Sequence, residues 1–230
     1  MANLCIIPAR GGSKRIPRKN IKPFLGKPII AYSIEAALKS NLFDEVMVST
    51  DDTEIAEIAK KHGAKVPFMR SKKNRNDFAT TMSVLQEVME SYKMRGQLFE
   101  NVCCIYPCAP FVTKDKLQSA YHKLLDESLD SVFPVIEFTT PVERSLNIRE
   151  NKVTFKYPEY TNTRSQDIEQ SYYDAGQFYW MNWQAVSKQN KILTSNSGAV
   201  IVSHIEAQDI DNEVDWKLAE LKYQLKNIVS

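Results

Sequence analysis

The sequence lacks several features that would assign it at once to a common class. Its 30 Lys and Arg residues are nearly balanced by 28 Asp and Glu residues, so no basic excess points to nucleic acid as a partner. No apolar run approaches the length of a membrane span, and the N-terminal residues do not have the pattern of a signal peptide. We therefore expect a cytoplasmic protein that binds neither nucleic acid nor membranes.

Cysteine and histidine are scarce, with four and three residues. The cysteines form no C-x-x-C pair, and Cys5, Cys103 and Cys104 lie in apolar, strand-like runs, which predicts buried reduced thiols and argues against a zinc site or disulfides. The histidines are scattered, and no Ser-His-Asp or Cys-His arrangement is visible. Covalent catalysis is therefore not indicated.

The sequence does contain a regular alternation of strand and helix patterns over its first two thirds. Apolar runs predict strands at 4–9, 45–50, 65–68, 101–106 and 131–136, and amphipathic segments predict helices at 27–39, 51–62, 80–93 and 113–127. This alternation predicts an α/β fold with three layers and a mostly parallel sheet. In such sheets ligands bind beyond the carboxyl ends of the strands.

The pattern breaks at about residue 139. Residues 139–175 are polar, with short β-like pieces and no long helix, which predicts an inserted arm within one domain over 1–230. Alternation resumes with strands at 177–180 and 199–202. The last helix, 213–225, carries Val214, Leu218, Leu221 and Leu225 on one face.

The first predicted strand opens directly into a glycine-rich, strongly basic loop. Gly11 and Gly12 would let backbone N–H groups approach an anion, and Arg10, Lys14 and Lys19 would add charge-assisted contacts. The loop fits neither G-x-x-x-x-G-K-[ST] nor G-x-G-x-x-G, so an ATPase P-loop is excluded and a dinucleotide site is not indicated. Several positive charges so close together repel one another unless an anion neutralises them. The loop therefore favours a polyphosphate site over a basic surface turn.

Two carboxylates, Asp209 and Asp211, stand just before the last helix. In an extended segment residues two apart point to the same side, so this pair can hold a hard cation such as Mg²⁺ beside substrate phosphates. The alternative is helix capping by Asp211 or Asn212. The spacing supports both interpretations equally.

Two further segments contain weaker candidates for site residues. Thr50 or Asp51 follows a predicted strand and is expected to cap the next helix. Arg70 and Asp77 lie in the polar connection after the third predicted strand, where Arg70 contacts either a nucleotide or solvent.

The arm and the aromatic run after it suggest a sugar site. Arg164 and Gln166 on the arm, with the aromatic residues of 172–180, suit a sugar-like acid, because rings stack on its apolar face and Arg164 binds its carboxylate. The alternative for Phe178 and Trp180 is a core strand.

Three segments together resemble the CMP-nonulosonate synthetases, which include the CMP-sialic acid synthetases. The matching segments are Ile7-Pro8-Ala9-Arg10-Gly11-Gly12-Ser13-Lys14 with Ile16-Pro17 and Lys19-Asn20, Val48-Ser49-Thr50-Asp51-Asp52, and Asp209-Ile210-Asp211-Asn212-Glu213. They occur in family order over nearly the whole chain. The segment 106–112 differs from that of the sialic acid synthetases, and 172–180 looks most like the pseudaminic acid cytidylyltransferases of the same family.

The resemblance implies a Rossmann-like nucleotide-diphospho-sugar transferase fold and a CTP-dependent cytidylyltransferase. The anomeric hydroxyl of a nonulosonic acid attacks the α-phosphorus of CTP, giving a CMP-sugar and pyrophosphate. It implies nucleotide contacts from Ala9, Arg10, Gly11, Gly12, Ser13, Lys14, Asn20, Arg70 and Asp77, catalysis by Arg10, Lys19 and Asp211, Mg²⁺ on Asp209 and Asp211, and sugar contacts from Arg164, Gln166, Gln177 and Tyr179.

It further implies a homodimer in which the arm is donated across the interface. Two alternatives stay open. One is a synthetase acting on N-acetylneuraminate, another nonulosonate or an octulosonate. The other is a catalytically silent nucleotide-binding module.

Overall fold

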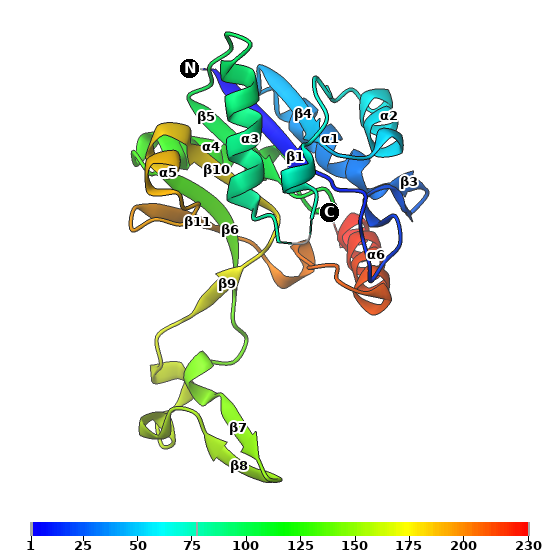
Figure 1. Cartoon of the computed structure of the whole chain (residues 1–230). Helices are drawn as coiled ribbons and strands as arrows, with labels where there is room; N and C mark the ends of the chain where they lie inside the picture. The colour runs from blue at the N-terminus through cyan, green and yellow to red at the C-terminus, as the bar shows by residue number, and fades with distance from the viewer. Residues whose placement is uncertain (1, 77, 230) are drawn as a thin grey trace.

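The computed structural model describes residues 2–76 and 78–229, and Asp77 therefore lies outside the described residues. Its main body is a seven-stranded sheet in the order β11-β6-β10-β5-β1-β4, with β9 also paired to β6 (Figure 1). The strands are β1 (Asn3–Pro8), β4 (Glu45–Ser49), β5 (Asn101–Ile105), β6 (Ser131–Glu137), β9 (Tyr172–Asp174), β10 (Phe178–Asn182) and β11 (Ser197–Ile201). β1, β4 and β5 are parallel, whereas β10 runs antiparallel to both β5 and β6.

Helices cover both faces of this sheet. They are α1 (Ile29–Ser40), α2 (Thr53–Lys61), α3 (Thr81–Lys93), α4 (Lys114–Asp126), α5 (Trp183–Gln189) and α6 (Glu213–Val229). Residues of α1, α2 and α4 share one core cluster with Cys5 and Ile7, and residues of α3 and α5 share another with Leu4 and Ile6. Leu4 to Ile7 of β1 are fully buried between the two clusters, which accounts for the continuous apolar run in this part of the strand. The predicted three-layer α/β fold is confirmed.

Two local predictions are wrong. Residues 65–68 do not form a strand, and only Lys65 makes an isolated parallel bridge to Met47. Pro67 has no N–H to donate, so a continuous ladder cannot extend through it. The first helix begins at Ile29 and not at residue 27, because Lys27–Pro28 pairs as β3 with β2 (Pro23–Phe24).

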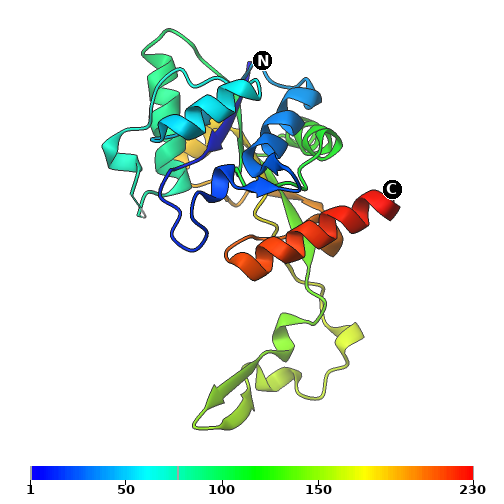
Figure 2. The ribbon, with the colours of Figure 1, turned by 90° about the vertical axis from the view of Figure 1, so that its right-hand side faces the viewer.

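An arm leaves the sheet between β6 and β9 and returns to it at Tyr172 (Figures 1 and 2). Its far end is a two-stranded hairpin of β7 (Leu146–Arg149) and β8 (Lys152–Phe155). Short 3₁₀ turns lie elsewhere along the arm at Val142–Arg144, Pro158–Tyr160 and Ser165–Asp167. The structure therefore separates a packed body from a slender projection.

The last helix, α6, packs on the body through the side opposite to its leucine stripe. Trp216 and Ala219 are buried, and the Trp216 ring meets Phe24 edge to face at 5.6 Å. Leu218 and Leu221 remain 42% and 63% exposed. The apolar face predicted from the sequence exists, but it faces away from the core.

Among the described residues, no helix is both long enough and apolar enough to span a membrane. The cytoplasmic location expected from the sequence stays a prediction.

Candidate active site

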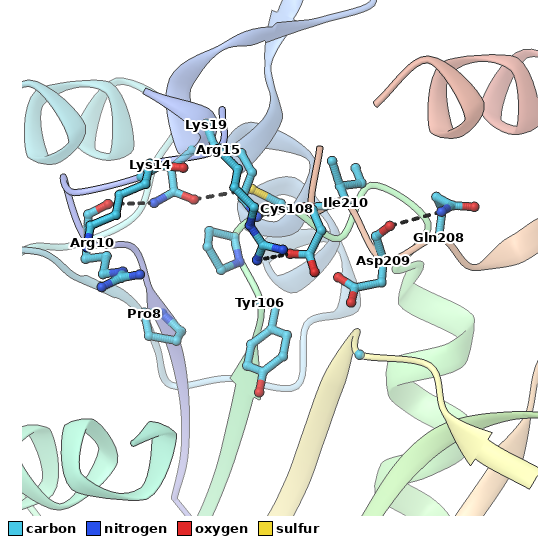
Figure 3. A pocket seen from close by; sticks show the side chains of 15 residues that line it. Pro8, Arg10, Lys14, Arg15, Lys19, Tyr106, Cys108, Gln208, Asp209 and Ile210 are labelled. Atoms are coloured by element: carbon cyan, nitrogen blue, oxygen red, sulfur yellow. Dashed lines mark hydrogen bonds and ion pairs between the residues drawn. The ribbon is translucent and has the colours of Figure 1, made fainter. Parts of the chain in front are cut away.

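A cavity of about 410 Å³ lies beyond the carboxyl ends of β1 and β5. The loop after β1 forms one wall, and the segment that leads into α6 forms another (Figure 3). The residues lining it are Pro8, Arg10, Ser13, Lys14, Arg15, Lys19, Asn20, Tyr106, Pro107, Cys108, Gly176, Gln208, Asp209, Ile210 and Asp211. The fold thus brings together two segments that are about 190 residues apart in the sequence.

The cationic side chains of the basic loop face this cavity. In Figure 3, Arg10 and Lys14 lie on one side and Asp209 on the other, with Lys19 between them. The Lys19 ammonium donates to the Ile210 carbonyl at 2.7 Å and so links the two walls directly. Asn20 donates to the Arg10 carbonyl at 2.9 Å, which fixes the start of the loop.

Gly11 does not act as predicted. The Gly11 N–H donates to the Asp51 carboxylate at 3.0 Å and is not directed at an incoming anion. A Cβ at Gly11 would lie 2.7 Å from an Asp52 oxygen, whereas a Cβ at Gly12 would meet nothing within 4 Å. Gly11 therefore allows close packing against the start of α2, and the side-chain cations supply the positive charge of the cavity.

Asp52, and not Thr50 or Asp51, caps α2. Its carboxylate accepts from the Ile55 N–H at 3.0 Å, and it also forms an ion pair with Arg18 of the basic loop. The hydrogen bond from Arg18 lowers the pKa of Asp52 to about 2. Asp51 and Asp52 thus anchor the loop, a role the sequence could not show because it requires contacts 34–40 residues apart.

The two interpretations of the acidic segment are separated by the hydrogen bonds at the start of α6. The Asn212 side chain accepts from the N–H of Asp215 at 3.0 Å, and the Asp215 side chain accepts from the N–H of Asn212 at 3.0 Å. This reciprocal pair is a capping box. Asp211 does not cap the helix, and its carboxylate lines the cavity together with that of Asp209.

The two carboxylates make the electrostatic potential on this side of the cavity more negative. Burial, and then the charge of Asp211, raise the pKa of Asp209. Asp211 accepts a hydrogen bond from Arg15 at 2.7 Å, but both side chains are substantially exposed, so this ion pair is weak. No cluster of three or more His, Cys, Asp or Glu ligands occurs in the part of the chain that the structure describes. A divalent cation here would complete its shell with water and substrate oxygens.

Arg70 does not line the cavity. Its guanidinium is buried and donates to the Ser49 hydroxyl at 3.1 Å and to the Ser49 carbonyl at 2.6 Å. Burial lowers the pKa of Arg70. In this structure it fixes the end of β4, so the interpretation as a solvated loop arginine is wrong.

The aromatic run mixes core residues with residues beside the cavity. Phe178 and Trp180 are fully buried in the sheet, as the alternative interpretation predicted. The Tyr179 ring packs 5.5 Å from that of Tyr106, which lines the cavity. Gln177 is 3% exposed and donates to the Glu206 carbonyl, while its Oε1 has no hydrogen-bond partner among the described residues.

Comparison with known proteins identifies the family. A model of the cytidylyltransferase family matches residues 4–224. The chain belongs to the cytidylyltransferase family. The resemblance inferred from the three motifs is thereby confirmed.

Several characterised relatives match nearly the full chain. The pseudaminic acid cytidylyltransferase of Campylobacter jejuni is 42% identical and covers 99% of this chain and 98% of its own. The CMP-N,N'-diacetyllegionaminic acid synthase of Legionella pneumophila is 34% identical, and the match covers 98% of this chain and 97% of the relative. The solved structure of CMP:2-keto-3-deoxy-manno-octonic acid synthetase complexed with CTP has a TM-score of 0.71 over 99% of both chains at 18% identity, which supports the fold alone.

None of the four predicted sugar contacts lines the cavity of this cytidylyltransferase. Gln177 and Tyr179 are buried beside it, and Arg164 and Gln166 lie on the arm. Arg164 is exposed on the arm and pairs with Asp167 at 2.8 Å. Gln166 lines a separate hollow at the base of the arm, with Phe138 and Ile201. Neither side chain reaches the cavity from its own chain.

Sequence reasoning missed several lining residues, among them Arg15, Tyr106, Cys108 and Gln208. Tyr106 and Cys108 follow directly after β5, and this position at the carboxyl end of a parallel strand was the available signal. Gln208 had no local signal, because its place depends on how α6 docks.

Proposed function

We propose that this cytidylyltransferase transfers CMP from CTP to a nonulosonic acid of the pseudaminic type and releases pyrophosphate. The observation that carries the proposal is the meeting of the Arg10–Lys19 loop with Asp209 and Asp211 in one cavity. The nucleotide and the sugar are those named for the Campylobacter jejuni relative and its family. Cations on one wall and carboxylates on the other suit a reaction that needs charge neutralisation and positioning.

In the proposed reaction the anomeric hydroxyl of the sugar attacks the α-phosphorus of CTP. The new bond joins the sugar oxygen to this phosphorus, and the bond to the bridging oxygen breaks, so that pyrophosphate takes the electron pair. Arg10, Lys14 and Lys19 neutralise the triphosphate and then the departing pyrophosphate. Ser13 and Asn20, which line the cavity, shape the nucleotide side, whereas Ala9 is buried in the core at the end of β1.

Asp209 and Asp211 are the residues that would hold Mg²⁺, which supplies positive charge at the reacting phosphate when bound. The raised pKa of Asp209 and the exposed ion pair of Asp211 with Arg15 fit a carboxylate pair that gains from a cation. We propose that either Asp211 or a metal-bound hydroxide accepts the proton of the attacking hydroxyl. Arg15, which donates to Asp211 at 2.7 Å, would compete with the cation for this carboxylate.

We further propose that Gln177 and Tyr179 contact the sugar. A buried acceptor without a donor is costly, and a hydroxyl or amide N–H of the substrate would satisfy the Gln177 Oε1. Arg164 and Gln166 would complete the site from a second chain, as a homodimer in which each arm reaches the partner's cavity. One cytidylyltransferase domain over 1–230 carries both the body and the arm.

The test is a matrix of nucleotides and sugar acids with Mg²⁺. We expect pyrophosphate release with CTP and pseudaminic acid, and at least roughly 10²-fold lower kcat/KM with UTP or GTP, because a site that hydrogen-bonds one base leaves its groups unpaired with another. Turnover with N,N'-diacetyllegionaminic acid alone would support the specificity of the Legionella relative instead. Thermal stabilisation by CTP without turnover of any acid would indicate a silent binding module.

A further inference from the structure

The residues just before the acidic pair are held by lysines from two helices. Lys226 of α6 donates to the Glu206 carboxylate at 2.9 Å, and Lys222 of α6 donates to the Ala207 carbonyl at 2.9 Å. Lys116 of α4 lies 3.2 Å from the same Glu206 oxygen, and its side chain is only 13% exposed. Burying charged groups costs free energy, and apolar side chains of similar volume often stabilise a fold at least as well. These contacts therefore serve to fix a position more than to add stability.

Lys116 also reaches the connection between β5 and α4. Its ammonium donates to the Phe111 carbonyl at 3.2 Å, and residues 106–108 at the start of the same connection line the cavity. Burial lowers the pKa of Lys116 to about 8, although the charge of Glu206 opposes this shift, so the ammonium is charged at pH 7. Lys116 thus ties together two segments that each lead to the cavity.

The Glu206 carbonyl determines how the Gln177 side chain is oriented. Gln177 Nε2 donates to this carbonyl at 2.6 Å. Because a carbonyl oxygen only accepts hydrogen bonds, the amide N–H groups must face it and the Oε1 must point away. The Oε1 is buried and has no hydrogen-bond partner among the described residues, which is a costly state for an acceptor. The position of Glu206 therefore decides which atom Gln177 offers to a ligand.

We infer that Lys116 is a positioning residue for the reaction, because it holds Glu206 where the Glu206 carbonyl orients the Gln177 amide for the sugar. Lys116 is not among the residues that line the cavity, so it acts through Gln177 and not on the substrate. The group selected on the sugar is a hydrogen-bond donor, either a hydroxyl or an amide N–H, because the Oε1 only accepts. The inference rests on the proposed function, which assigns Gln177 to the sugar.

The first test is a double-mutant cycle between Lys116 and Gln177 at pH 7. Lys116→Met and Gln177→Ala should each raise KM for the sugar acid about tenfold, and the double variant should raise it no further, because one residue acts only through the other. KM for CTP should change by less than about twofold in all three variants, because the cations of the basic loop bind the triphosphate. A rise of about 100-fold in the double variant, equal effects on both substrates, or an unchanged KM in Lys116→Met would each overturn the inference.

The matched control for the cycle lies on the same helix. Lys123 is a cation about two turns further along α4 and pairs with Glu127 at 3.3 Å, so Lys123→Met should change neither KM. Lys116→Arg keeps a charged donor and should recover most of the lost affinity for the sugar. Circular dichroism verifies that each variant is folded, and Lys116→Gln takes the place of Lys116→Met in the cycle if the latter does not fold.

The second test follows the Gln177 side chain without any turnover. NMR of the glutamine side-chain amides in isotopically labelled protein detects its Nε2 hydrogens, and Gln177→Ala identifies their signals. We expect slow exchange with water in the parent chain and in Lys123→Met, and exchange at least about tenfold faster in Lys116→Met, because the hydrogen bond to Glu206 is loosened.

The two tests separate the inference from the proposed function. Unchanged exchange in Lys116→Met beside normal turnover of the parent chain refutes only the positioning role. Faster exchange in Lys116→Met, with a parent chain that turns over no sugar acid, refutes only the proposed function.

Discussion

At the scale of single residues, the start of α6 separates carboxylates that look alike in the sequence. Asp215 caps the helix, whereas Asp211 lines the cavity. Asp211→Ala should therefore lower kcat by at least roughly 10²-fold, the usual loss on removing a group that stabilises transition-state charge, with the fold intact. Pyrophosphate release at saturating CTP and Mg²⁺ measures this.

The matched control is Asp215→Ala. This variant should lose about 1 kcal/mol of unfolding free energy, because its cap is removed. It should lower kcat far less than Asp211→Ala does, because near the cavity it removes only the hydrogen bond from the Asp211 N–H at 2.9 Å. Near-normal rates for Asp211→Ala would show that the metal assignment is wrong.

Gly11 and Gly12 offer a second matched pair. Gly11→Ala places a Cβ 2.7 Å from the Asp52 carboxylate and must displace the anchor of the basic loop, whereas Gly12→Ala meets open space. We expect KM for CTP to rise about tenfold for Gly11→Ala, equivalent to about 1.4 kcal/mol of lost binding free energy, and to change little for Gly12→Ala. Equal effects of the two substitutions would contradict the anchoring role.

The ion pair of Asp52 with Arg18 predicts a pH dependence of stability. The pKa of Asp52 in the folded chain is lowered to about 2, so its contribution is present above its unfolded pKa of about 4 and is lost as the pH falls toward 2. Asp52→Asn keeps a good cap but loses this charge. The melting temperature of this variant should be lower than that of the parent chain at pH 7 and should approach it at pH 2. A difference in melting temperature that does not change with pH would argue against the ion pair.

At the scale of elements, the position of the acidic segment depends on the docking of α6. Trp216 is buried against the same cluster as Ile210, and Ile210 is the residue between Asp209 and Asp211 in the sequence. Trp216→Ala should lower the free energy of unfolding by roughly 3–5 kcal/mol and also reduce turnover, because the carboxylates lose their support. Urea unfolding and pyrophosphate release measure the two effects. Gln224→Ala, an exposed change on the same helix, should alter neither.

The strands show how an element's role depends on its neighbours. Alternation predicted parallel β1, β4 and β5, since each is an apolar run followed by a helix. The antiparallel direction of β10 could not be predicted, because it follows from the return of the arm to the sheet between β5 and β6. The local sequence from Phe178 to Trp180 therefore predicts a strand, whereas the direction of this strand depends on the whole sheet.

At the scale of the whole molecule, the proposed exchange of arms predicts complementation between inactive chains. Asp211→Ala removes a residue of the body, and Arg164→Ala removes one of the arm. A heterodimer of the two contains one site with both residues intact, provided that the arm acts in the partner's cavity. Half of the dimers in an equal co-expression are heterodimers with one of two sites active, so about a quarter of the parent activity should return.

Separately purified and unmixed variants give the baseline for this measurement. An activity equal to the average of the two baselines would show that Arg164 acts within its own chain or not at all.

The sequence by itself determined the class of the sheet, the basic loop and the family, because each depends on residues that are neighbours along the chain. Periodic burial sets the helices and strands, and the opening motif lies within fifteen residues. Only the tertiary structure decided that Gly11 packs against Asp52 and that the stripe on α6 faces outward. These features depend on contacts between distant segments and on which side of a helix the body covers, and one amphipathic pattern is compatible with either side.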